Sequence, residues 1–362
     1  MKKLGFGFLR LPRIAGEGSP VDDRLLEQLV DTFLARGGRY FDTAYTYLGG
    51  ESEAALCRTL VRRHPRSAYE IADKLPGDLV KEPGDCRRFF EESLARCGVE
   101  RFDVYMLHWL NAENYRIAEQ FDEFGFLTQL KREGKVGRIG FSYHDSAELL
   151  DRILTAHPEV DCVLLQLNYF DWDSPSIQAR ACYETVVRHG KSVLVMEPVR
   201  GGMLAAPTED AMAILPPGSP AVTALRFAQS LDGVETVLSG MNAPAQVEEN
   251  LADLPPMTEA ERTACLRAAE VLRRNTAVAC TGCGYCLEHC PTGIPIPRCL
   301  ALYNDYARHP GDDWKIQPVY AALSARNAAA SACIGCRQCE EHCPQKLEIS
   351  GWMTKIARVF ES

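Results

Sequence analysis

The stretch "DDRLLEQLVDTFLARGGRYFDT", residues 22–43, joins an amphipathic helix to a short buried strand. Its first part carries apolar residues at spacings of three and four, which place them on one helix face before two glycines end the pattern: Leu25, Leu26, Leu29, Val30 and Phe33. The next five residues, "RYFDT", form a β-rich run. A helix that ends at glycines and leads directly into a strand is the repeating unit of an α/β fold.

Seven similar β-rich runs occur along the chain, and a helical pattern follows each one. With the first, the runs are 5–9, 39–43, 69–74, 102–108, 138–142, 162–168, 192–197 and 236–240. Apolar strands that alternate with amphipathic helices predict a parallel sheet covered by helices. Eight such units in about 250 residues fit a (β/α)₈ TIM barrel. An open doubly wound sheet is the alternative, but no GxGxxG follows the first run.

The composition is that of a soluble globular chain of about two domains, with 362 residues, 46% of them hydrophobic and 25% charged. A formal net charge of -9 and the lack of a long basic run argue against nucleic-acid or membrane partners. The opening "MKKLGFGFLRLPR" lacks the apolar region of a signal peptide, and no run approaches the ~18 apolar residues of a membrane span. We therefore expect a cytoplasmic protein.

Four chemically complementary side chains follow the carboxyl ends of the early strands, where barrels place their active sites. They are Asp42, Tyr47, Lys74 and His108. A tyrosine is a poor acid at neutral pH unless a cation stabilises its phenolate. Lys74 can supply that cation, Asp42 can hold the lysine charged, and His108 can donate to a carbonyl oxygen. Taken singly, each has a plainer structural interpretation as a cap, a loop aromatic, a solvated lysine or a rim histidine. Their convergence favours protonation of an alkoxide as hydride arrives.

The motifs around these residues resemble those of the aldo-keto reductase family. They are "FDTAYTYLGGESE" (41–53), "IADKLP" (71–76), "FDVYMLHW" (102–109), "GFS" (140–142), "LLQLNY" (164–169), "MEPVRGGML" (196–204) and "QVEEN" (246–250). The resemblance covers roughly residues 1–270. It implies NAD(P)H-dependent reduction of a carbonyl substrate, or oxidation of an alcohol in reverse, with Tyr47 as the proton donor. The family's catalytic tetrad falls at the four positions already named.

The resemblance also implies a nicotinamide site. Ser142 and Gln166 match the residues that hold the nicotinamide amide, and Glu249 and Asn250 match positions at the adenine end.

The chain departs from the family pattern at four positions of this site. Tyr143 stands where asparagine is usual, and Met196 where a tyrosine often stacks on the nicotinamide ring. Gly240 and Gln246 occupy positions near which basic residues grip the 2′-phosphate of NADP. Losing a charge-assisted bond to phosphate costs roughly 1.5–3 kcal/mol. A strong NADP preference is therefore doubtful, and NAD, weak nicotinamide binding, a flavin or another electron source all stay open.

Eight of the fifteen cysteines form two copies of the run C-x₂-C-x₂-C-x₃-C-P beyond residue 279. The first copy is Cys280, Cys283, Cys286 and Cys290, and the second is Cys333, Cys336, Cys339 and Cys343. This run is the bacterial ferredoxin signature for [4Fe–4S] clusters. Zinc also accepts four cysteines, but its ribbons usually use two separated CxxC pairs. The spacing therefore predicts two [4Fe–4S] clusters.

In two-cluster ferredoxins the fourth cysteine of each run ligates the other cluster. We therefore expect Cys343 to join the first three cysteines of the first run, and Cys290 to join those of the second.

The connection 291–332 contains two helical patterns, which is typical of a helical ferredoxin. A helix at 258–275 ends the barrel part, so residues 1–270 form the barrel and residues 271–362 a smaller, mainly helical ferredoxin-like domain. The seven scattered cysteines are expected to be small buried residues.

Three functions fit these features. The first is an aldo-keto reductase that draws electrons from NAD(P)H, from the clusters, or from both. The second is an electron carrier whose barrel is mainly a docking scaffold for a redox partner protein. The third is an ordinary reductase of small carbonyl compounds beside structural clusters. The intact tetrad favours an enzyme, because a scaffold has no need of it.

Overall fold

The computed structural model describes residues 3–15, 19–253, 255–308 and 313–361. The chain forms two compact units. The first comprises Met1–Val199 and Ala221–Glu259, and the second comprises Arg200–Pro220 and Ala260–Ser362. No helix in the described ranges has the length and apolar character needed to cross a membrane.

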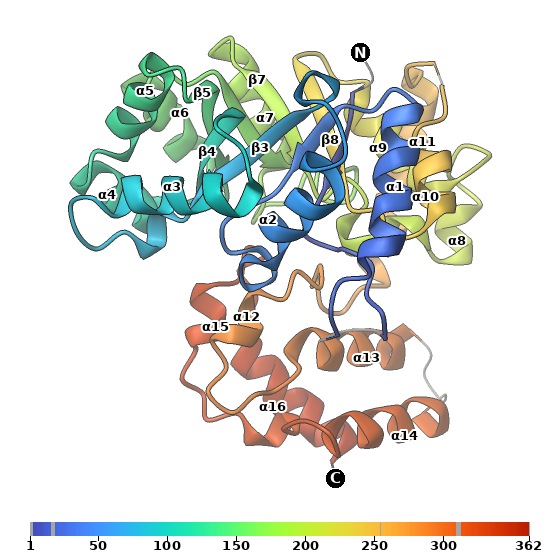
Figure 1. Ribbon diagram of the computed structural model, residues 1–362. Coiled ribbons are helices and arrows are strands. Elements are labelled where there is room, and N and C mark those ends of the chain that lie inside the picture. The colour runs from blue at the N-terminus through green and yellow to red at the C-terminus, as the bar shows by residue number, and fades with distance from the viewer. Residues whose placement is uncertain (1–2, 16–18, 254, 309–312, 362) are drawn as a thin grey trace. The chain divides into compact units, whose positions relative to one another are not determined.

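The first unit contains eight parallel strands that close into a barrel in sequence order, as the sequence predicts (Figure 1). The strands are β1 (Leu4–Gly7), β2 (Tyr40–Asp42), β3 (Glu70–Leu75), β4 (Phe102–Leu110), β5 (Val136–Tyr143), β6 (Cys162–Gln166), β7 (Ser192–Met196) and β8 (Val234–Ser239). Pairing of Gly5 with both Tyr40 and Leu238 joins the first strand to its two neighbours and closes the barrel. The open-sheet alternative is therefore wrong.

Helices surround this barrel. They are α1 (Asp23–Ala35), α2 (Glu51–Leu56), α3 (Asp85–Cys97), α4 (Ala112–Gln120), α5 (Glu123–Arg132), α6 (Ala147–Ala156), α7 (Ala179–Arg188), α9 (Pro220–Gln229) and α10 (Pro244–Asn250). Shorter segments are η1 (Tyr47–Gly50), the π-helical η2 (Cys57–Val61), η3 (Arg66–Ala68) and η4 (Gly77–Leu79). Helix α1 begins where the Asp22 carboxylate accepts from the Leu25 N–H, and Gly37 follows its end with φ +86°.

The barrel interior is filled by inward-facing side chains that alternate along each strand. They include Tyr40, Ala72, Val104, Met106, Cys162, Leu164, Leu194 and Leu238. Residues two positions further along the same strands keep the same orientation. These inward rows therefore lead from Tyr40 to Asp42, from Ala72 to Lys74, and from Met106 to His108. The alternation of side chains along each strand is sufficient to bring these three polar groups to the carboxyl end of the barrel, and no special loop is needed.

The second unit is helical, and its described residues contain no strand. Its elements are η5 (Arg200–Ala205), α8 (Glu209–Met212), α11 (Glu259–Arg274), α12 (Tyr285–Glu288), α13 (Ile296–Arg308), α14 (Asp313–Ser324), η6 (Ala330–Ala332), α15 (Gln338–Glu341) and α16 (Ile349–Phe360). Of the two helical patterns expected in the connection 291–332, the second is helical only in part, because α14 ends at Ser324. The expected domain limit at 270/271 falls inside α11 and stays a prediction.

A structural repeat of 53 positions organises the second unit. Helices α12 and α15 start at Tyr285 and Gln338, and helices α13 and α16 start at Ile296 and Ile349. Positive φ angles recur at the same offset, in the pairs Gly282 and Gly335, Gly284 and Arg337, and Gly293 and Lys346. Helix α13 packs against α16, and α12 against α15 (Figure 1). The repeat thus extends beyond the cysteine runs to a complete loop-and-helix module.

Candidate functional site

A buried ion pair lies at the carboxyl end of the barrel. Lys74 Nζ lies 2.6 Å from Asp42 Oδ1 and donates to the Thr43 carbonyl oxygen at 2.7 Å. The lysine side chain is fully buried and that of Asp42 is 3% exposed. Burial raises the pKa of Asp42, while the lysine charge acts in the opposite direction. A buried ammonium held by one carboxylate and one carbonyl has a fixed position, and its charge can act on a neighbouring group.

That neighbouring group is Tyr47, the first residue of η1. Lys74 Nζ lies 4.8 Å from the centroid of its ring. The His108 ring contacts the same tyrosine edge-on, with centroids 5.6 Å apart. Burial, followed by the charge on Lys74, lowers the pKa of His108 well below its usual value, so the imidazole is neutral near pH 7. The structure thus brings together all four residues of the tetrad expected from the sequence.

The two residues expected to hold the nicotinamide amide also lie at this end of the barrel. Ser142 Oγ accepts a hydrogen bond from the Trp109 N–H at 2.7 Å, which leaves the hydroxyl proton for another acceptor. Gln166 Nε2 donates to Asp171 Oδ2 at 2.8 Å. Asn168 donates to the same carboxylate at 2.9 Å and to the Glu197 carbonyl at 3.0 Å. Asp171 and Asn168 orient Gln166, and sequence reasoning missed both, although two polar residues in the apolar run after β6 are a usable signal.

The departures from the family pattern have structural roles of their own. Tyr143 donates its hydroxyl proton to the Ser146 carbonyl oxygen at 2.6 Å, beside the start of α6. Burial raises the pKa of this phenol. Met196 is half-buried and packs on the apolar residues that fill the barrel. Neither residue replaces the amide chemistry of asparagine or the ring of tyrosine.

The expected adenine end lies between β8 and α10. Gly240 offers no side chain, and Gln246 Oε1 accepts from the Asn242 and Ala243 N–H groups at 2.8 and 3.2 Å. Gln246 thereby caps α10. Glu249 is exposed, and Asn250 Nδ2 donates to Ser239 Oγ at 3.2 Å. Asn250 Oδ1 is buried without a hydrogen-bond partner in the described residues, so it is an acceptor that an amino group of a ligand can satisfy.

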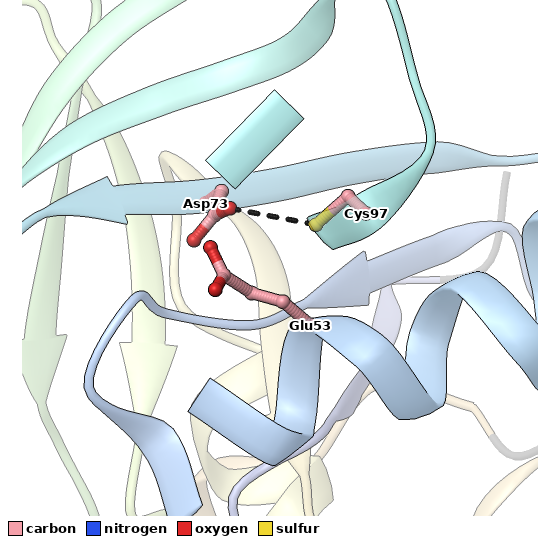
Figure 2. Close-up of side chains that lie close together, drawn as sticks. All are labelled: Glu53, Asp73 and Cys97. Atoms are coloured by element: carbon pink, nitrogen blue, oxygen red, sulfur yellow. Dashed lines mark hydrogen bonds between the residues drawn. The ribbon is translucent and has the colours of Figure 1, made fainter. Parts of the chain in front are cut away.

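A second buried polar cluster lies on the outer side of β3. Figure 2 shows Glu53 from α2, Asp73 from β3 and Cys97 from α3 pointing toward one another. Cys97 Sγ donates to Asp73 Oδ2 at 3.7 Å, and Arg96 Nε lies 2.8 Å from Glu53 Oε2. Burial raises the pKa of both carboxyls, and the pKa of Asp73 is raised further by Glu53. The arginine supplies the positive charge that a metal ion would bring.

This cluster shows one limit of the sequence analysis. All seven scattered cysteines are buried, as expected: Cys57, Cys86, Cys97, Cys162, Cys182, Cys265 and Cys299. However, Cys97 is a hydrogen-bond donor to a buried acid and not only a small apolar residue. The adjacent residues Asp73 and Lys74 point to opposite sides of their strand, which a linear motif does not show.

All eight cysteines of the two runs lie in the second unit. A pocket in this unit is lined by Cys290 together with Cys333, Cys336 and Cys339. After burial, the pKa of Cys286 is raised by Cys283 and Cys280 of its own run and then by Cys343 and Cys339 of the other run. Burial raises the pKa of Cys339 to about 11, and its thiol neighbours include Cys290. The pocket thus places Cys290 with the first three cysteines of the second run, as the crossed ligation expected from the spacing requires.

The donor set and its surroundings suit iron–sulfur clusters. Each set offers four thiols, and none of the eight is in a disulfide. The backbone N–H of Gly282 donates to Cys280 Sγ at 3.3 Å, and that of Ile294 donates to Cys290 Sγ at 3.4 Å. Hydrogen bonds to the sulfur ligands are a usual means of tuning such clusters. Burial, followed by the charges of neighbouring groups, raises the pKa of Cys286 and Cys339, whereas at Cys290 burial is outweighed by hydrogen bonds from Thr292, Ile294 and Gly293, which lower the pKa of this thiol.

Comparison with known proteins gives matches to both units. Residues 3–265 match the aldo/keto reductase family, and residues 279–348 match the 4Fe-4S dicluster domain. An aldo-keto reductase of Mycolicibacterium vanbaalenii is 27% identical over 237 residues, which cover 64% of this chain and 78% of that protein. The NADH-specific methylglyoxal reductase of Escherichia coli is 25% identical over 301 residues and covers 68% of this chain and 88% of its own length.

Solved structures show the same barrel. An aldo-keto reductase from Bacillus halodurans superposes with a TM-score of 0.60 at 22% identity, covering 74% of this chain and 91% of its own. One from Klebsiella pneumoniae, in complex with NADPH, has a TM-score of 0.57 at 17% identity, with coverages of 74% and 90%. The family match extends over more than half of the chain and agrees with the closed barrel. This chain belongs to the aldo/keto reductase family of oxidoreductases and carries a 4Fe-4S dicluster domain after its barrel.

Proposed function

We propose that the barrel reduces an aldehyde or ketone, or oxidises the corresponding alcohol, with Tyr47 as the proton donor. The observation that carries this proposal is the buried pair of Lys74 and Asp42, whose ammonium lies 4.8 Å from the centroid of the Tyr47 ring. A positive charge beside a phenol favours its ionised form and so makes it a better acid. An oxidoreductase that adds hydride to a carbonyl carbon needs such an acid at the oxygen.

Each residue of the tetrad has a distinct role. Tyr47 gives its phenolic proton to the carbonyl oxygen as negative charge develops there. Lys74 stabilises the resulting phenolate, and Asp42 keeps the lysine in place through the 2.6 Å contact. His108 is neutral, because burial and Lys74 lower its pKa, so it can donate one N–H to the carbonyl oxygen without adding a second buried cation. The dry surroundings strengthen each of these interactions.

We further propose that the nicotinamide cofactor is NADH in preference to NADPH. A bound nicotinamide supplies the hydride. Ser142 and Gln166 would hold its amide, and Asn250 would accept from the adenine amino group. Gly240 and Gln246 supply no cation for a 2′-phosphate, and the exposed Glu249 would repel one. Arg10 lies beside Gly240, but its guanidinium is bonded to Glu197 at 2.8 Å. The similar protein from Escherichia coli is named as NADH-specific.

We assign the two sets of four cysteines to two [4Fe–4S] clusters that exchange electrons with the barrel reaction or with a redox partner. Each cluster supplies one electron, so the pair matches the two electrons that convert a carbonyl into an alcohol, while Tyr47 supplies one proton and solvent the other. Two alternatives are an electron carrier with a docking barrel and a reductase with purely structural clusters. The buried tetrad speaks against the first, since an ion pair in a dry site is costly to maintain without a catalytic use.

The proton-donor role is tested with anaerobically purified protein and a small carbonyl substrate such as methylglyoxal. Tyr47→Phe should lower kcat by ~10²–10⁴-fold, as expected for loss of a general acid, with iron and sulfide content unchanged. Tyr45→Phe is the matched control, because this neighbouring phenol donates to Glu92 instead. Full activity of Tyr47→Phe would contradict the proposal. The same assay with NADH and NADPH compares the two cofactors.

The electron role of the clusters needs a separate measurement. Protein reduced with dithionite and freed of excess reductant is mixed with carbonyl substrate and a catalytic amount of NAD⁺, and the alcohol formed is compared with the number of clusters oxidised. Two cluster oxidations, followed by visible absorbance, should accompany each alcohol formed. Clusters that stay reduced while NADH supports turnover would assign them a structural role and leave the role of Tyr47 intact.

A further inference from the structure

Arg200, in η5, is a buried cation beside the first cysteine run. The residue is 1% exposed and belongs to the second unit. Its Nη2 donates to the carbonyl oxygen of Ala279 at 3.0 Å and lies 3.5 Å from Gln345 Oε1. Ala279 directly precedes Cys280, and Gln345 follows Cys343 by two residues. One guanidinium therefore contacts both chain segments that supply the first cluster's ligands, as these were assigned above.

The backbone next to Arg200 packs closely against the first cysteine run. A Cβ atom at Gly201 would lie 1.9 Å from the carbonyl oxygen of Thr281, so no side chain can be placed there. Gly201 also has a φ of +64°, a conformation that suits glycine. Arg200 and Cys280 both line one pocket of about 400 Å³ in this unit. The close approach of the glycine holds the arginine against the Cys280 loop.

The second cysteine run has a different environment at the matching positions. Thr281 is 5% exposed, whereas its counterpart Ile334, 53 positions later, is 69% exposed. The arginine within the second run, Arg337, has a side chain that is 74% exposed. Charges in water are screened, whereas buried charges interact strongly. The two runs therefore carry near-identical ligands in unequal electrostatic surroundings.

We propose that Arg200 raises the reduction potential of the cluster held by Cys280, Cys283, Cys286 and Cys343. Reduction adds one electron, and hence one negative charge, to a [4Fe–4S] cluster and breaks no bond. A guanidinium remains charged at all pH values at which proteins fold, so it stabilises the reduced form more than the oxidised form. Net charge, hydrogen bonds to the sulfur atoms and solvent exposure are the usual determinants of cluster potential, and Arg200 acts through the first, its charge. When the protein holds a single electron, that electron therefore resides mainly on the first cluster.

The experiment is an anaerobic redox titration followed by electron paramagnetic resonance, on full-length protein with eight iron and eight sulfide per chain. Arg200→Gln should make one midpoint potential more negative, with about a tenfold change in the equilibrium constant for one-electron reduction, which is ~59 mV. The other potential should stay nearly unchanged. Arg200→Lys keeps the charge and should retain most of the wild-type value. Arg337→Gln is the matched control at the exposed site and should shift neither potential appreciably. Cys283→Ser identifies the signal of the first cluster.

Unchanged potentials in a fully loaded Arg200→Gln protein would overturn the proposal, as would equal shifts of both clusters. If both Arg200 variants lose the first cluster, the hydrogen bonds and not the charge are what matter, and the charge proposal fails. Loss of the first cluster in Arg200→Gln but not in Arg200→Lys supports the charge proposal. Fewer than eight iron atoms in wild-type protein would instead contradict the cluster assignment on which this inference rests.

Discussion

The imidazole rings of His289 and His342 stack with centroids 3.4 Å apart and planes inclined by 10°. Each histidine directly precedes the fourth cysteine of its run, and the two are 53 positions apart, the offset of the structural repeat. Equivalent residues that touch across a repeat lie on its local twofold axis. Cys290 and Cys343 therefore lie next to this axis, where the crossed ligation expected from the cysteine spacing requires them.

The crossed arrangement predicts which cysteine variants resemble each other. Cys343→Ala should remove the same spectroscopic signal as Cys283→Ala, and Cys290→Ala the same signal as Cys336→Ala. The physical reason is that a cluster is disturbed by loss of any one of its four thiolates. Electron paramagnetic resonance of the reduced proteins, with iron analysis, measures this. Cys299→Ala, at a buried cysteine outside both runs, is the control and should keep both signals. Pairing of Cys343→Ala with Cys336→Ala would favour uncrossed ligation.

The ion pair at the barrel end predicts an asymmetric effect on stability. Lys74→Met leaves the Asp42 carboxylate buried without its cation, which should cost about 3–5 kcal/mol at neutral pH. The loss should shrink at low pH, because protonation removes the uncompensated charge. Adding Asp42→Asn should recover much of the stability but no activity. Denaturant unfolding of the single and double variants between pH 5 and 8 tests this. Equal stability of Lys74→Met and wild type would show that the carboxylate is not isolated there.

Glu123, at the start of α5, predicts a pH dependence of stability. The residue is 1% exposed, and burial raises the pKa of its carboxyl to about 8. Because this pKa lies above that of the unfolded chain, the associated stability is present below about pH 4.5 and is lost as pH rises toward 8. Glu123→Gln should therefore stabilise the protein at pH 8 by on the order of 1–3 kcal/mol and have little effect near pH 5. Thermal melting measures this.

The matched control for that experiment lies at the other end of the same helix. Glu133 is exposed and bonded to Arg87, which lowers the pKa of its carboxyl. Glu133→Gln should not stabilise the protein at any pH. A Glu123→Gln protein whose melting temperature follows the wild-type pH profile would contradict the expectation.

The cofactor site predicts that a single cation can change nucleotide choice. Gly240→Arg should strengthen NADPH binding by about tenfold or more, since one charge-assisted bond to phosphate contributes roughly 1.5–3 kcal/mol. The substitution is sterically permitted, because a Cβ atom there would meet Arg10 Cβ at 3.4 Å and Arg10 Cγ and the Gly7 carbonyl oxygen at 3.9 Å, which are ordinary contacts. NADH affinity should change little. Fluorescence titration with both nucleotides gives the two dissociation constants. Gly240→Gln, which adds length without charge, separates charge from bulk.

The sequence is sufficient to predict the barrel and the convergence of the four tetrad residues at its carboxyl end. Short apolar strands followed by amphipathic helices are local patterns, and the inward alternation from Tyr40 to Asp42 follows from the strand period alone. The cysteine runs were equally readable, because four thiols at fixed spacing have few other uses. Each of these features is encoded over a few neighbouring residues.

Features that depend on contacts between distant segments could not be predicted from the sequence. Arg200 lies 80 residues before Cys280, and no pattern in "MEPVRGGML" shows that its guanidinium reaches Ala279. The cluster of Glu53, Asp73 and Cys97 likewise joins two helices and a strand. Such groups are assembled by packing, and a single sequence gives no measure of which buried polar residues meet.

The 53-position repeat has a consequence for how this protein came about and how it matures. Under the crossed assignment, each module provides three thiols for one metal centre and a fourth for the other, so neither module can be filled alone. Two copies of a single ancestral module, paired as a symmetric homodimer, would have met the same requirement before duplication joined them. In the present chain, loading of either centre needs both modules in place, so metal insertion and folding of the carboxyl-terminal part should proceed as one cooperative event.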